Sequence, residues 1–171
     1  MVGGLLFSDF FLEDILTTGA TIRSLRGGSG PPLLFLPGYP QTHFIWHKIA
    51  RRLAERFTVV LTDLRGYGDS SKPDRGRRHA NYSCRAMAQD QLEVMHHLGY
   101  EHFYVGSHDR GARTAHRLCL DHPEAVRKDC FMDIMPTLRM YRAIRRRSSP
   151  PSTCGGSFSS RSPHCQHMRR A

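Results

Sequence analysis

Two short, nearly continuous apolar runs constrain the fold of this chain most strongly. The runs are Leu33–Leu36 and Phe57–Leu61, and polar or turn-forming residues bound each of them. A strand with one face in water alternates apolar and polar residues, whereas a strand covered on both faces is apolar throughout. The two runs therefore predict buried strands of the kind found in parallel sheets.

Segments with helical periodicity alternate with these and other predicted strands. The predicted helices are 44–55, 82–98 and 110–120, and the further predicted strands are 20–25, 102–105 and 131–134. Strands that alternate with helices build βαβ units. The sequence thus predicts an α/β fold, a mostly parallel sheet with helices on both faces.

Composition excludes several classes of protein. No apolar run approaches the roughly 20 residues of a membrane-spanning helix, and no basic residue precedes the acid-interrupted stretch Leu5–Leu16, as a secretory signal would require. Five cysteines without a C-x-x-C pair argue against a disulfide scaffold and a zinc module. We predict a cytoplasmic protein that needs no cofactor or metal and does not enter a membrane.

The net charge of +10 is concentrated at one end of the chain. Residues 1–141 carry 18 basic and 15 acidic side chains, whereas residues 142–171 carry seven arginines and no acid. The second segment is also rich in Ser and Pro and poor in large apolar residues, so it cannot bury a core. We expect a folded segment, 1–141, followed by a disordered basic tail, 142–171.

The segment Ser107–Gly111 carries the clearest chemical signal. Its form is small-x-Asp-x-small, it follows a predicted strand, and it opens a predicted helix. This is the pattern of a nucleophile elbow, in which a strained turn lifts a nucleophile out at the edge of the sheet. A carboxylate nucleophile suits displacement at an sp3 carbon. The alternative interpretation is an ordinary Asp at a helix N-terminus.

Arg110 and Arg113 favour the first interpretation. They are three residues apart at a predicted helix start and so share a face beside Asp109. Planar guanidinium groups bind carboxylates in a bidentate manner, which indicates an anionic substrate. The alternative is a pair of solvated helix arginines.

Residues 10–141 resemble the fluoroacetate and haloacetate dehalogenases of the α/β-hydrolase fold. The matching stretches are Gly27–Pro32, Gly38–Thr42, Asp63–Pro73, His108–Arg113 and Met132–Thr137. Related epoxide hydrolases usually have Trp where this chain has Arg110, so the resemblance favours the dehalogenase branch. It implies a hydrolase that uses water to replace the halogen of a small 2-haloacid.

The resemblance also implies a role for individual residues. Asp109 matches the nucleophile that attacks the carbon bearing halogen, and Arg110 and Arg113 match the arginines that bind the substrate carboxylate. Asp133 matches the acid that orients the catalytic His. Tyr39 lies in the loop whose backbone N–H groups face the nucleophile.

Four other family positions are expected to be structural. Trp46 and Asp63 match the family and are expected to pack. Pro37 replaces a usual His, which affects the geometry of the loop, and Ser107 replaces a usual Gly with another small residue.

The resemblance implies an incomplete fold that lacks the helical cap and the last strands. None of the eleven histidines matches the family's base; His108 and His116 are expected to be spectators, as are His164 and His167 in the tail. We hypothesise an altered reading frame after about residue 141 and impaired turnover.

Two alternative functions remain open. The first is a catalytically inactive fragment whose tail, through Arg145–Arg147, binds polyanions; we expect no specific nucleic-acid partner, because the tail lacks interleaved aromatic residues. The second is epoxide hydrolysis, which Arg110 and Arg113 disfavour. The expected partners are a 2-haloacid and water.

Overall fold

The computed structural model describes residues 6–135 of the chain. All of them belong to the first of two compact units, Met1–Thr137. The predicted tail, 142–171, and the predicted end of the folded segment at residue 141 lie outside the described residues.

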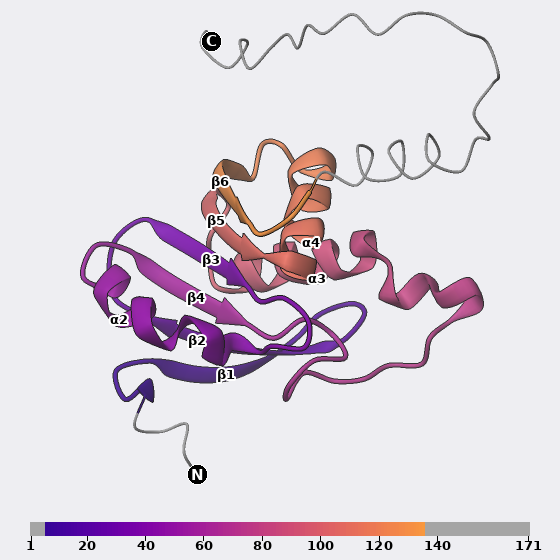
Figure 1. Ribbon diagram of the computed structural model, residues 1–171, viewed down its shortest axis with the longest axis horizontal. Coiled ribbons are helices and arrows are strands. Elements are labelled where there is room, and N and C mark those ends of the chain that lie inside the picture. Colours follow the sequence, from indigo (N-terminus) through magenta and orange to yellow (C-terminus); the bar gives the residue numbers. More distant parts are fainter. Residues whose placement is uncertain (1–5, 136–171) are drawn as a thin grey trace, which may run out of the picture. The chain divides into compact units, whose positions relative to one another are not determined.

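The described residues form one six-stranded sheet with helices (Figure 1). The elements are β1 Phe11–Leu16, β2 Thr21–Gly27, β3 Pro32–Leu36, η1 His43–Trp46, α2 His47–Ala54, β4 Thr58–Thr62, η2 Arg77–Tyr82, α3 Cys84–His97, β5 Phe103–His108, α4 Asp109–Asp121 and β6 Val126–Met132. The strand order is β1-β2-β4-β3-β5-β6. Strands β4, β3, β5 and β6 are parallel, and the β1–β2 hairpin joins β4 antiparallel. This is the predicted mostly parallel α/β sheet.

The pleat of the central strands divides the core into two clusters. On β3, Leu34 and Leu36 belong to one cluster and Phe35 to the other. On β4, Val60 belongs to the first cluster and Val59 to the second. Because successive side chains of a strand point to opposite faces, both faces of these strands are covered.

Different helices supply the two covers. Met87 of α3 and Leu118 of α4 pack in the first cluster, whereas Trp46 and Ala50 of η1 and α2 pack in the second. All five residues of β4 are buried. The two apolar runs therefore form the buried strands β3 and β4, as predicted, and the predicted helices lie on both faces of the sheet.

Two predicted elements differ from the structure, and one strand was not predicted. The helix predicted over 44–55 begins as the 3-10 turn η1 and becomes α-helical only at His47. The strand predicted over 131–134 is β6, which begins at Val126. Most of β6 is exposed, so its sequence lacks the apolar run that marks a buried strand. Strand β1, Phe11–Leu16, was not among the predicted strands.

A buried ion pair fastens the long connection between β4 and α3. Arg65 donates to both carboxylate oxygens of Asp90 at 2.6 Å, and it also donates to the carbonyl oxygen of Asn81 at 2.8 Å. Both partners of the ion pair are almost fully buried. Breaking such a pair strands a buried charge, so the connection is held firmly at both of its ends.

Candidate active site

Asp109 lies at the junction of β5 and α4, at the carboxyl edge of the sheet. Its φ of +44° is in the left-handed region that L-residues rarely adopt. The flanking Gly111 runs so close to the carbonyl oxygens of Leu36 and Pro37 that a Cβ would collide with them. The strained turn and close crossing are the features that the elbow pattern predicts.

The loop after β3 brings a backbone donor to this carboxylate. The N–H of Tyr39 donates to Asp109 Oδ2 at 3.0 Å. Gly38 permits the approach, since a Cβ there would lie 2.7 Å from His108 Nδ1 and 2.8 Å from Asp109 Cβ. An N–H donor in this position stabilises negative charge on a carboxylate oxygen or on a tetrahedral intermediate.

An open cavity of about 410 Å³ adjoins this loop. Its lining is Tyr39, Pro40, Gly66, Tyr67, Gly68, Tyr82, Met87 and Arg110. The Tyr39 and Tyr67 rings meet edge to face with their centroids 6.2 Å apart. The wall is thus largely aromatic and apolar with one guanidinium, which suits a small organic anion.

The pKa of Tyr67 is affected both by burial and by the charges around the cavity. Burial raises the pKa of its hydroxyl above the ordinary value, the Arg110 guanidinium lowers it, and the Asp109 carboxylate raises it. The phenol therefore stays protonated at neutral pH and offers a hydrogen-bond donor.

The two arginines occupy different environments. Arg110, which the resemblance implies to be a substrate-binding residue, is exposed and lines the cavity. Arg113 is half-buried on the same side of α4 and is not among the residues that line this cavity. The structure therefore brings one of the two predicted carboxylate-binding residues to the cavity wall.

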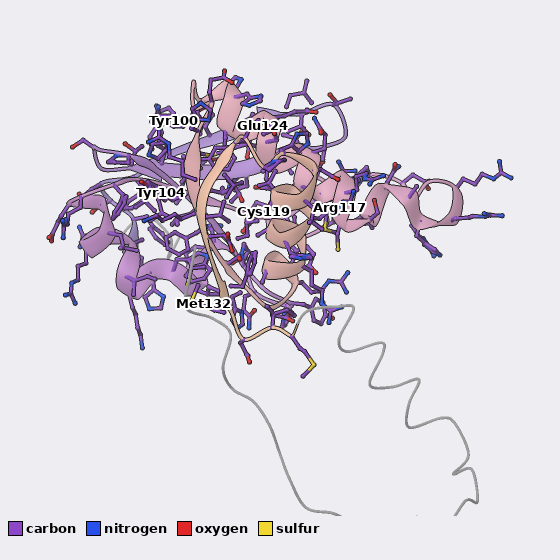
Figure 2. All side chains as sticks on the ribbon, turned by 90° about the horizontal axis from the view of Figure 1, so that it is seen from above. Tyr100, Tyr104, Arg117, Cys119, Glu124 and Met132 are labelled. Atoms are coloured by element: carbon purple, nitrogen blue, oxygen red, sulfur yellow. The ribbon has the colours of Figure 1, made fainter. Side chains whose placement is uncertain are left out.

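Asp133 follows β6, at the same edge of the sheet as the junction of β5 with α4. In Figure 2, Met132 marks this end of β6, and Tyr100 and Glu124 lie near the other end. Asp133 is 87% exposed, and its Oδ2 lies 3.6 Å from Nε2 of His108. His108 is the residue before the candidate nucleophile, so the histidine beside Asp133 is one that the sequence indicated as a spectator.

Trp46 and Asp63 are structural, as expected. The Trp46 ring packs against Phe35 at a tilt of 42°, with the ring centroids 4.6 Å apart. Asp63 is fully buried and accepts hydrogen bonds from the backbone N–H of His43 at 2.7 Å and from that of Asp69 at 3.2 Å. The carboxylate of Asp63 thus organises the turn that carries Gly68 of the cavity wall.

Sequence reasoning missed Tyr67, Tyr82 and Met87 as cavity residues. They come from a long loop and from α3, and only the folded connection between β4 and α3 brings them together. The stretch Asp63–Pro73, which carried the family resemblance, contains Gly66–Gly68, and this resemblance was the one sequence signal that could have pointed to these cavity residues.

Within residues 6–135 no three His, Cys, Asp or Glu side chains gather as they would around a metal ion. No helix in that part of the chain is long and apolar enough to cross a membrane.

Comparison with known proteins places this geometry in a family. Residues 31–149 match the model of the alpha/beta hydrolase fold family. The chain is 52% identical over 141 residues to a fluoroacetate dehalogenase from Burkholderia sp, covering 82% of this chain and 46% of that protein. It is 37% identical over 123 residues to a soluble epoxide hydrolase from Corynebacterium sp. (strain C12), covering 72% of this chain and 41% of that protein.

A solved structure supports the same assignment. A protein from Nostoc sp PCC 7120, assigned to the alpha/beta hydrolases, is 61% identical with a TM-score of 0.78, over 80% of this chain and 47% of that one. The chain thus spans about half the length of the relatives it matches. The similarity supports the haloacetate dehalogenase branch, and the chain belongs to the alpha/beta hydrolase fold family.

Proposed function

We propose that this chain carries the nucleophile of a hydrolytic dehalogenase that acts on small 2-haloacids. The observation that carries the proposal is the Asp109 carboxylate on its strained turn, 3.0 Å from the Tyr39 N–H. The similarity to a fluoroacetate dehalogenase supports the choice of substrate.

In the first step a carboxylate oxygen of Asp109 attacks the carbon that bears halogen. The new C–O bond forms as the C–halogen bond breaks, and the halide leaves with the electron pair of that bond. Arg110, at the cavity wall, binds the substrate carboxylate, and Arg113 assists it from the same side of α4. Asp109 is left as a carboxymethyl ester.

In the second step water attacks Cγ of Asp109 and releases the 2-hydroxyacid. The charge that develops on the remaining oxygen of the tetrahedral intermediate is stabilised by the Tyr39 N–H. The acyl C–O bond then breaks, the carboxylate is regenerated, and one proton is released. Asp133 is the acid proposed to support the base of this step.

We also propose that the ester accumulates in this chain. None of its eleven histidines matches the family's base. His108 lies beside Asp133, but its Nδ1 is buried next to Gly38, where a base would not reach free water. Alkylation is therefore expected to be faster than hydrolysis.

The proposal is tested by incubating the 171-residue chain with fluoroacetate while intact mass and free fluoride are followed. We expect the mass to rise by one carboxymethyl group, with about one equivalent of fluoride released per chain. Sustained fluoride release that is lost in Asp109→Asn would support Asp109 as the nucleophile but would contradict the accumulation of the ester. A folded chain that gives neither adduct nor fluoride would overturn the proposal.

Epoxide hydrolysis at the same carboxylate is a second candidate. The 37% identity to a soluble epoxide hydrolase favours it, since ring opening of an epoxide also forms an ester with a carboxylate nucleophile. An adduct from styrene oxide and none from fluoroacetate would reverse the order of the two candidates.

A further inference from the structure

The connection between β4 and α3 presents an unusual concentration of positive charge. We call residues 72–79 the basic arm; it carries Lys72, Arg75, Arg77 and Arg78 against a single acid, Asp74. In Figure 1 the connection extends outward from the sheet before it returns to α3, and in Figure 2 nitrogen-tipped side chains fan out from it into solvent. The three arginines are all exposed.

The charges of the arm are not neutralised by neighbours. Two other exposed arginines have acidic partners: Arg51 pairs with Asp9, and Arg85 with Asp121. Within residues 6–135, no ion pair engages Arg75, Arg77 or Arg78. The Asp74 carboxylate instead accepts the Gly76 N–H at 2.8 Å.

The backbone holds the arm in an uncommon conformation. Arg78 and His79 have φ values of 55° and 59°, in the left-handed region, which is energetically costly for residues with a Cβ. Two hydrogen bonds from Asn81 oppose that cost: its Nδ2 donates to the Asp74 carbonyl at 2.8 Å, and its N–H donates to that of Arg75 at 3.3 Å. The arm is therefore a shaped turn, and its strain is supported by its neighbours.

The arm is attached to the wall of the cavity. Tyr82, at the end of η2, lines the cavity and donates its hydroxyl hydrogen to the Pro73 carbonyl at 2.8 Å. Arg65 donates to the Asn81 carbonyl, and the next residue, Gly66, also lines the cavity. The backbone of the arm is thus linked through Tyr82 and Arg65 to the wall of the cavity.

We propose that the basic arm attracts small carboxylate anions electrostatically and so raises their concentration at the cavity. The inference rests on the proposed function and extends it from binding at Arg110 to capture from solution. Unpaired positive charge beside a cleft raises the local concentration of anions and their rate of encounter. The effect vanishes for a neutral substrate and is screened by salt, because the Debye length falls from about 10 Å at 0.1 M to about 3 Å at 1 M.

The chain offers a matched control on the opposite face of the sheet. Lys48, Arg52 and Arg56 lie on or just after α2 and are exposed. The triple variants R75Q/R77Q/R78Q and K48Q/R52Q/R56Q therefore remove the same net charge, one beside the cavity and one away from it.

The test measures the second-order rate constant for alkylation of Asp109 by chloroacetate and by neutral chloroacetamide. Mass spectrometry of the peptide that carries Asp109 separates this reaction from alkylation of cysteines. At 20 mM salt the arm variant is expected to lose about fivefold with chloroacetate, and the α2 variant less than about twofold. At 1 M salt this loss of rate is expected to disappear. With chloroacetamide the arm variant is expected to react as fast as the unaltered chain.

Two outcomes overturn the inference in distinguishable ways. Equal losses in the two triple variants, or a loss in the arm variant that also affects chloroacetamide, would contradict capture by the arm and leave the proposed function standing. Absence of any alkylation of Asp109 in the unaltered chain would overturn the proposed function and the inference with it.

Discussion

The two carboxylates that the sequence singled out stand in contrasting parts of the molecule. Asp109 follows β5, which has a parallel partner on each side, and a strained turn and the N–H of Tyr39 define its position. Asp133 follows β6, which pairs with β5 on one side only among the described residues, and 87% of its side chain is exposed. The candidate nucleophile is held by the covered centre of the sheet, and the candidate acid is not.

The contrast separates two halves of the proposed chemistry. Attack on the halogen-bearing carbon needs Asp109, a backbone donor and a cation, and β3, β5 and α4 bring these together within the described residues. Hydrolysis needs a base and its acid, and Asp133 has only a 3.6 Å contact with His108. The proposed attack by Asp109 depends on backbone packing. Substitutions of the packed glycines should therefore change the stability of the fold or the rate of alkylation.

Gly111→Val is expected to have the largest effect on the Asp109 side. A branched side chain there would collide with the backbone carbonyls of Leu36 and Pro37, which cannot rotate away. We expect a loss of about 3 kcal/mol in the free energy of unfolding, at the upper end of the usual cost of overpacking. Urea unfolding followed by circular dichroism measures it, and an unchanged midpoint would contradict the close crossing.

Gly38→Ala is expected to act mainly on chemistry. The new Cβ would lie within 3 Å of His108 Nδ1, Asp109 Cβ and Gln41 Oε1 and push the loop that carries Tyr39 away. We expect alkylation of Asp109 by fluoroacetate to slow about tenfold, the equivalent of one hydrogen bond. Gly99→Ala is the control for backbone strain away from the site, because its φ is +84° while nothing lies within 4 Å of a Cβ there. Equal rates in both variants would show that the Tyr39 N–H does not contribute.

Features with a local sequence pattern could be predicted, whereas features that depend on distant contacts could not. Ser107–Gly111 predicted the elbow because its pattern is local, and Leu33–Leu36 predicted β3 because burial on both faces leaves a continuous apolar run. The Tyr67–Tyr82 wall depends on a buried ion pair between residues 25 positions apart, Arg65 and Asp90, which no local pattern marks. The start of β6 was missed because its residues are mostly exposed.

Tyr67 provides a pH-dependent test of the cavity wall. Its pKa is raised mainly by burial, so the folded state prefers the neutral phenol. Stability from this preference is complete below the ordinary pKa of about 10 and is lost as the pH rises through the higher folded value. Thermal melts at pH 9 to 11 should show a smaller decline in Tyr67→Phe than in the unaltered chain. Parallel declines would mean that Tyr67 is solvated.

Asp133→Asn is expected to have the smallest effect. The side chain is exposed and weakly paired, so we expect less than about 0.5 kcal/mol in stability and less than about twofold in the rate of Asp109 alkylation. Thermal melts and stopped-time mass spectrometry measure the two quantities. A large loss in alkylation would show that Asp133 supports the nucleophile, and the separation of the two halves would be wrong.

Locating the covalent adduct by peptide mass spectrometry, after incubation with fluoroacetate, tests the central claim most directly. Asparagine tolerates the left-handed backbone of residue 109, so Asp109→Asn should keep the fold and serve as the reference. We expect one carboxymethyl ester, on the Asp109 carboxylate, in the unaltered chain and none in the variant. A carboxymethyl group on any other side chain, or the same adduct in Asp109→Asn, would contradict this expectation.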